Sequence, residues 1–178
     1  MRGAILGTSE SPVFLHIDQR LIGDNLTVKW CDFSEESVTK KQKKALIHVN
    51  LQRSGGIPEV WLNEKFKDEL SILSDKGDES VGIAGDAMRQ WLALMVWEKV
   101  LVWAIKNEDL DAENMPATRI ATDWRKCFNE NNWGDLPDPG DLQDADELDA
   151  LSMKIQHVLE TGKKLSRINR ITGFTRNN

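Results

Sequence analysis

The chain has 178 residues, of which 40% are hydrophobic and 29% are charged, a balance that is typical of a globular protein and excludes the low-apolar signature of disorder. Its length is that of one ordinary domain, so we expect a single domain over residues 1–178. The net charge of −6 argues against free nucleic acid as the main partner.

Cysteine usage and hydropathy indicate a cytoplasmic protein. Cys31 and Cys127 are the only cysteines, and they fit neither a zinc-ligand spacing nor a disulfide framework. Residues 1–7 lack the hydrophobic core of a secretory signal. The most apolar run, residues 91–105, is shorter than the roughly 20 residues of a membrane span and contains two charges, so we expect no membrane association.

The first elements in chain order are two predicted strands. Apolar and polar residues alternate in residues 13–18 and again in residues 26–31, which is typical of half-buried strands. A hairpin turn at Gly23-Asp24 would join them with self-consistent faces. The predicted facing pairs are Ile17 with Trp30, Asp18 with Lys29, and His16 with Cys31.

A second hairpin is predicted from residues 45–51 and 57–62, around a Gly55-Gly56 turn. In this register Val49 faces Leu62 and Leu51 faces Val60, giving one apolar face. The opposite face is polar and carries His48, Asn50, Gln52, Glu59 and Trp61. We therefore expect an N-terminal antiparallel sheet of two hairpins in about residues 3–62.

About four helices are expected in residues 63–171, which makes the fold class α+β. Asn63 can cap a short helix. The next helix, residues 80–106, is apolar on almost every side of its latter half and should be the central, largely buried element, with Trp91, Trp97 and Trp103 in the core. A third helix is predicted over 120–128, and a last one is predicted to begin at Asp141.

No catalytic, cofactor or metal motif stands out, so we expect a non-catalytic protein without a cofactor or metal site. The nearest arrangement to a catalytic cluster is His16 with Asp18, which residue alternation projects from one face of a strand. His48 would join them if the two hairpins aligned their polar faces. An enzyme of unfamiliar type, centred on these three residues, is therefore an alternative.

An acidic block predicts a protein-binding surface over residues 131–149. Eight acids occur between Phe128 and Ser152 without any Lys or Arg, and Trp133 lies among them. Exposed tryptophans are frequent anchors at protein interfaces, so Trp133 and Trp61 either meet a partner or fold back on their own domain. The predicted binding residues are Trp133, Asp135, Asp138, Asp144, Asp146, Asp149 and Trp61.

Two basic clusters give a further alternative, nucleic-acid association, because lysines and arginines can neutralise phosphates. The residues are Lys40, Lys41, Lys43, Lys44, Lys163, Lys164, Arg167 and Arg170. Aromatic side chains that could stack on bases are not interleaved with them. We rank these alternatives below the hypothesis based on the acidic block: an accessory subunit, inhibitor or immunity-type protein that binds a basic protein partner through its acidic surface.

Overall fold

The computed structural model describes residues 26–35, 42–51, 56–72, 79–109, 112 and 115–159. The first strand of the predicted first hairpin, with His16 and Asp18, lies outside these residues, as does the Gly23-Asp24 turn. Lys40, Lys41 and the basic C-terminal residues also lie outside them.

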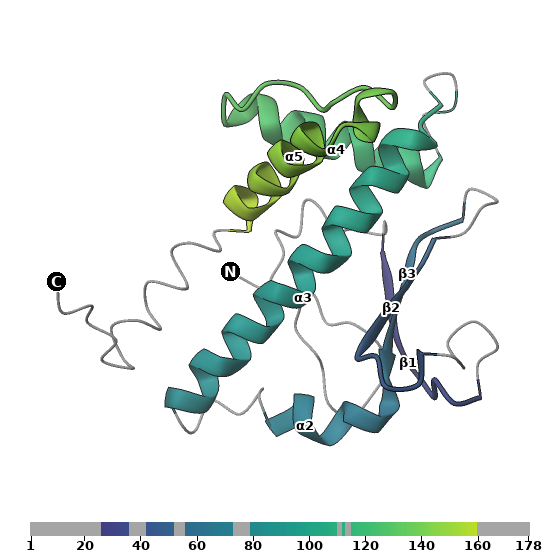
Figure 1. Cartoon of the computed structure of the whole chain (residues 1–178), viewed down its shortest axis with the longest axis vertical. Helices are drawn as coiled ribbons and strands as arrows, with labels where there is room; N and C mark the ends of the chain where they lie inside the picture. Colours follow the sequence, from purple (N-terminus) through teal and green to yellow (C-terminus); the bar gives the residue numbers. More distant parts are fainter. Residues whose placement is uncertain are drawn as a thin grey trace, which may run out of the picture.

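Three strands and four helices make up the described fold, and the predicted α+β class is confirmed (Figure 1). The strands are β1 (Thr27–Cys31), β2 (Ile47–Asn50) and β3 (Glu59–Asn63). The helices are α2 (Lys67–Ile72), α3 (Glu79–Lys106), α4 (Pro116–Glu130) and α5 (Ala145–Val158). Two 3-10 turns complete the set, η2 (Glu64–Phe66) and η3 (Asp141–Gln143).

The sheet is mixed, because β3 lies between β1 and β2 in the order β1-β3-β2. β2 and β3 form the expected antiparallel pair, whereas β1 runs parallel to β3. The prediction of a purely antiparallel sheet was therefore wrong for this part of the chain. Local alternation predicts a strand and its two faces, but a parallel pairing joins distant residues and leaves no signal in either strand.

The register of β2 on β3 differs from the predicted one by two residues. Val49 pairs with Val60, and Ile47 pairs with Leu62. The predicted facing pairs were wrong, but the two faces were right, because side chains alternate with a period of two along a strand. His48 therefore still faces Trp61 on the polar side.

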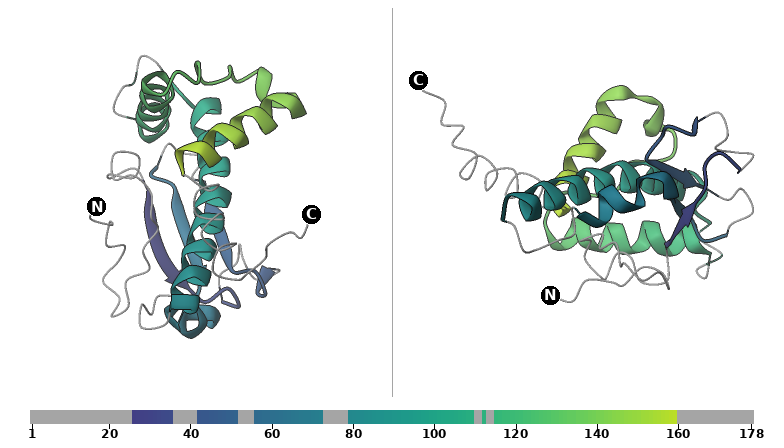
Figure 2. Two further views of the ribbon diagram at one scale, coloured as in Figure 1. Left: turned by 90° about the vertical axis from the view of Figure 1, so that its left-hand side faces the viewer. Right: turned by 90° about the horizontal axis from the view of Figure 1, so that it is seen from below.

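The apolar face of the sheet packs against α3. Leu26, Val28, Val60 and Leu62 belong to one core cluster with buried residues of α3, α4 and α5. Figures 1 and 2 show α3 lying along the sheet, while α4 and α5 gather around its C-terminal half. The apolar stripes of the strands and helices are thereby removed from water together.

The three tryptophans of α3 do not share one environment. Trp97 is fully buried and Trp103 is 8% exposed, as predicted, but Trp91 is 50% exposed. The prediction for Trp91 was wrong because neither the sheet nor α4 covers its side of the helix among the described elements. Nearly continuous apolarity in a helix sequence does not tell which face lacks a neighbour.

The last helix begins three residues later than predicted. Asp141 opens the 3-10 turn η3, and Asp144 is the N-cap of α5, its carboxylate accepting a hydrogen bond from the Asp146 amide at 2.9 Å. The prediction that Asn63 is a helix cap is correct. Its side chain accepts a hydrogen bond from the Lys65 amide at the start of η2. Leu151 and Ile155 are the buried residues of α5.

Candidate functional site

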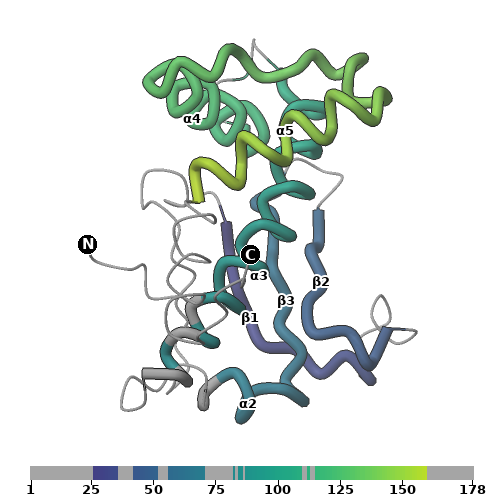
Figure 3. Tube along the Cα trace, turned by 60° about the vertical axis from the view of Figure 1, so that its left-hand side comes forward, coloured from purple at the N-terminus to yellow at the C-terminus, as the bar shows by residue number. Residues whose placement is uncertain are grey.

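The carboxylates of the acidic block are exposed on the loop after α4 and on the first turns of α5. Figure 3 traces the backbone of this loop and of α5. Among the described residues, no ion pair is formed by the seven acids from Asp135 to Asp149. The exposed acids are Asp135, Asp138, Asp141, Asp144, Asp146, Glu147 and Asp149. Asp135 and Asp138 contribute to the raised pKa of Arg125, whereas the carboxylates of α5 are left for solvent or for a partner.

The two bases beside this surface have other contacts. Arg125 forms a two-pronged ion pair with Glu108, at 2.5 and 2.6 Å, and this contact raises the pKa of Arg125. The Lys154 amine donates to the Asp135 carbonyl at 3.2 Å and lies 5.3 Å from the centre of the Phe128 ring. Neither base neutralises a carboxylate of α5.

Trp133 covers the molecule's own core. Its ring lies 6.1 Å from Phe128 and 5.6 Å from His157, and it is partly buried. Phe128 in turn contacts Trp124, which contacts Trp97. Trp133 is therefore the outer end of a row of aromatic rings that joins α3, α4 and α5, and much of its surface is already used inside the domain.

An open groove of about 280 Å³ lies between α3 and α5. A hydrogen bond from the Ser152 hydroxyl to the Glu98 carboxylate ties the two helices together at this point. Leu148 stands at the groove with 37% of its surface exposed. The lining residues are Glu98, Val102, Leu148, Asp149, Leu151, Ser152 and Ile155.

Beyond the groove, the same face of α3 continues as a mainly apolar stripe. Trp91, Met95, Glu98 and Val102 are spaced by three or four residues and so lie on one face of the helix. Trp91 exposes half of its large side chain at the far end of this stripe. The sequence did contain a signal for this face: a charged residue, Glu98, shares its spacing, which does not suit a fully buried helix side.

The opposite, polar face of the sheet satisfies its own polar groups. The Trp61 indole donates to Glu59 at 2.8 Å, and Asn50 donates to the same carboxylate at 3.2 Å. Lys29 pairs with Glu59 at 3.2 Å and lies 4.7 Å from the centre of the Trp61 ring. Hydrogen bonding, first from Trp61, lowers the pKa of Glu59. Trp61 is only 7% exposed, so it folds back on its own domain.

His48 completes this face without forming a catalytic cluster among the described residues. Its ring lies 5.5 Å from that of Trp61, and burial, with a contribution from the charge of Lys99, lowers the pKa of His48. His16 and Asp18 lie outside the described residues, so their approach to His48 stays a prediction. Within the described ranges no three His, Cys, Asp or Glu side chains come together as metal ligands.

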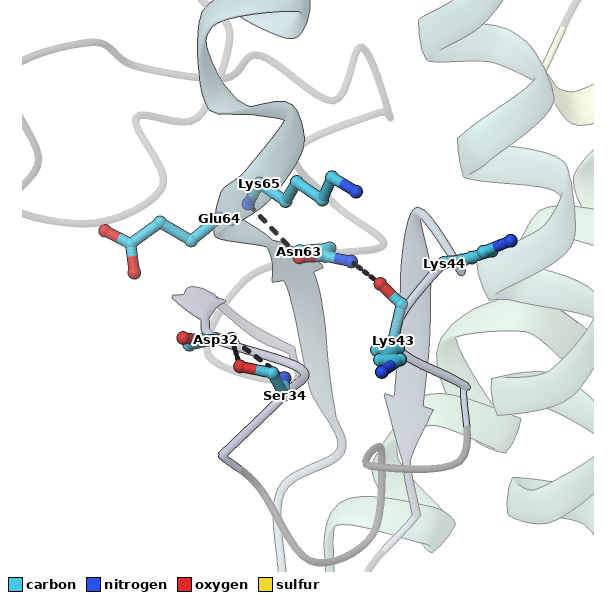
Figure 4. A pocket seen from close by; sticks show the side chains of 7 residues that line it. All are labelled: Asp32, Ser34, Lys43, Lys44, Asn63, Glu64 and Lys65. Atoms are coloured by element: carbon cyan, nitrogen blue, oxygen red, sulfur yellow. Dashed lines mark hydrogen bonds between the residues drawn. The ribbon is translucent and has the colours of Figure 1, made fainter.

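Of the basic residues predicted to contact nucleic acid, the structure describes Lys43 and Lys44. They lie at one edge of the sheet and line a second, larger pocket (Figure 4). Lys65 joins them there although it is some twenty residues further along the chain. Sequence reasoning placed Lys43 and Lys44 in a candidate site but missed Lys65, because only the pairing of β2 with β3 brings the two segments together.

Comparison with known proteins does not assign the chain to a family: no protein-family model, curated protein or solved structure matches it. None of the helices described for this chain combines the length and apolarity needed to cross a membrane. The cytoplasmic location stays a prediction.

Proposed function

We propose that this protein is a non-catalytic binding protein whose α3/α5 groove, with the acidic surface beside it, takes up a basic and apolar segment of another protein. The observation that carries this proposal is the half-exposed Trp91 on the same helix face that lines the groove. Inhibitor, accessory-subunit and immunity-type roles are all compatible with such a surface.

The groove has the two parts expected of an interface. Trp91 and Leu148 offer large apolar side chains, and burying such groups in a water-excluded centre supplies most of the binding energy. Asp149 lines the groove beside Leu148, and Asp146 belongs to the exposed acidic surface next to it; such charges mainly steer association.

The chemistry of the groove restricts the partner segment. Carboxylates without an internal counter-ion favour Lys and Arg on the partner, and the narrow apolar stripe favours side chains repeated at helical spacing. An amphipathic basic helix satisfies both conditions. Trp133, whose ring already packs on Phe128, is a weaker anchor than Trp91.

The test is affinity capture with the full chain from its native cells, followed by identification of any stoichiometric partner and measurement of association and dissociation rates. Trp91→Ala should speed dissociation about thirtyfold, as expected for a hot spot worth about 2 kcal/mol. Asp146→Lys with Asp149→Lys should slow association and weaken its dependence on salt. Asp144 is left unchanged because it caps α5.

The matched control is Asp68→Lys with Glu69→Lys, which reverses two exposed carboxylates in the first turn of α2. This variant makes the same change in net charge away from the groove and should keep the wild-type rates. Equal loss of binding in both charge variants, or unchanged dissociation of Trp91→Ala, would contradict the proposal. If Trp133→Ala speeds dissociation and Trp91→Ala does not, the aromatic anchor is Trp133, in the loop after α4.

A further inference from the structure

The second pocket lies at the edge of the sheet where two strands end and one begins. β1 and β3 are parallel, so their carboxyl ends meet at this edge, and β2 starts there because it is antiparallel to β3. The pocket is open and encloses about 550 Å³. Its lining residues are Asp32, Ser34, Lys43, Lys44, Asn63, Glu64 and Lys65. Carboxyl ends of parallel strands are a recurrent position for ligand sites.

Asn63 holds the rim of this sheet-edge pocket in place. Its side chain is 1% exposed and donates to the carbonyls of Lys43 and Ala45, at 3.1 and 2.8 Å. Its oxygen accepts from the Lys65 amide at 3.1 Å. Asn63 thus joins the segment before β2 to the segment after β3, and its hydrogen-bonding groups are used by the protein itself.

The charged groups of the pocket are separated into two sides. Figure 4 shows the amines of Lys43, Lys44 and Lys65 to one side of Asn63 and the carboxylates of Asp32 and Glu64 to the other. Within the described part of the chain these three lysines form no ion pair. Three amines without a counter-ion make a site for an anion with several oxygens, above all a phosphate group.

Carboxylates beside such an anion site need a ligand that also donates hydrogen bonds. Asp32 already accepts from the Ser34 amide and hydroxyl at 2.8 and 2.7 Å, which lowers the pKa of Asp32 and keeps it an acceptor. An ionised carboxylate favours hydroxyl groups over a second phosphate. A volume of about 550 Å³ is within the range of small-molecule sites, roughly 300–1,000 Å³.

We propose that the sheet-edge pocket binds a small phosphorylated sugar, with the phosphate on Lys43, Lys44 and Lys65 and the sugar hydroxyls on Asp32 and Glu64. A free sugar phosphate and a nucleotide share this chemistry. A nucleic-acid strand fits less well, because the lining contains no aromatic side chain on which bases could stack and two carboxylates that repel a continuous backbone.

The proposal is tested by calorimetric titration of the full chain with ribose 5-phosphate, adenosine monophosphate, inorganic phosphate, ribose and a single-stranded oligonucleotide. Ribose 5-phosphate or adenosine monophosphate should bind at least about tenfold more tightly than phosphate or ribose alone, since each part adds contacts. Which of the two binds better distinguishes the free sugar phosphate from the nucleotide.

Lys44→Ser with Lys65→Ser should weaken this binding at least about tenfold. The matched control is Lys106→Ser with Lys126→Ser, two exposed lysines on α3 and α4 with the same change in net charge. Tightest binding by the oligonucleotide, no preference over inorganic phosphate, or equal loss in both lysine variants would overturn the proposal. Trp91→Ala should leave the titration unchanged, so this site and the α3/α5 groove are tested separately.

Discussion

The polar face of the sheet and the α3/α5 groove both combine a tryptophan with carboxylates, yet they differ in what those groups contact. On the sheet, Glu59 accepts from Trp61 and Asn50 and pairs with Lys29, so the face is complete in itself. On the helices, Trp91 is half exposed, and the carboxylates of α5 have no ion-pair partner among the described residues. Residue composition alone therefore does not identify an interface. An interface is indicated by side chains that have no partner among the described intramolecular contacts.

The largest expected effect separates the two sides of α3. Trp97→Ala should lower the free energy of unfolding by about 3–5 kcal/mol, because it empties a fully buried site. Trp91→Ala should cost less than about 1 kcal/mol, since half of the side chain is exposed. Urea denaturation of both variants measures the difference. Similar losses in the two variants would mean that Trp91 also packs inside the domain.

A milder variant sharpens this result. The Trp97 indole nitrogen is buried and has no hydrogen-bond partner in the described structure. Trp97→Phe keeps most of the ring volume and removes that unpartnered donor, so it should cost much less than Trp97→Ala. A loss as large as that of Trp97→Ala would contradict this expectation.

The next effect concerns the buried amide at the sheet edge. Asn63→Ala should lower the free energy of unfolding by about 2–3 kcal/mol, because it leaves the carbonyls of Lys43 and Ala45 and the Lys65 amide without their partner. Asn63→Asp keeps the oxygen that caps η2 but turns the donor into an acceptor facing two carbonyls. It should therefore destabilise at least as much in denaturant titration at neutral pH. A neutral Asn63→Asp variant would mean that the two carbonyls find other donors.

A smaller, pH-dependent effect compares a satisfied carboxylate with an unsatisfied one. The folded-state pKa of Glu59 is lowered, so its contribution to stability is present above the ordinary value of about 4.5 and is lost as pH falls through the folded pKa. Glu59→Gln should cost about 1 kcal/mol at pH 7, and this cost should vanish at low pH. Asp149→Asn, on the groove rim, should be nearly neutral at both pH values. Thermal unfolding across this pH range measures both; a cost of Asp149→Asn equal to that of Glu59→Gln would remove the contrast between the two surfaces.

The smallest expected effect involves His48. Its folded-state pKa is lowered, so protonation favours the unfolded chain, and stability should fall as pH drops below about 6.5 until the folded pKa is passed. His48→Gln should remove this part of the pH dependence without changing the stability at pH 8. If the slope between pH 7 and pH 5 is the same in the variant, His48 is not the residue that titrates.

Local patterns in the sequence determined the α+β class, the three described strands, the faces of β2 and β3 and the positions of α3 and α4. These features depend on the spacing of apolar residues along one segment, which the sequence displays directly. The capping of η2 by Asn63 was also predictable, because a cap involves only adjacent residues.

The tertiary structure alone decided how these segments meet. The parallel pairing of β1 with β3, the shift of β2 by two residues, the exposure of Trp91 and the approach of Lys65 to Lys43 all depend on contacts between residues far apart in the chain. An antiparallel pairing of β1, or the predicted register of β2, would keep the same alternation of apolar residues along each strand. Only the packing of the sheet on α3 and of α5 on α3 distinguishes these arrangements from the observed one. Both candidate binding sites lie where such segments meet, which is why the sequence indicated some of their residues but neither site as a whole.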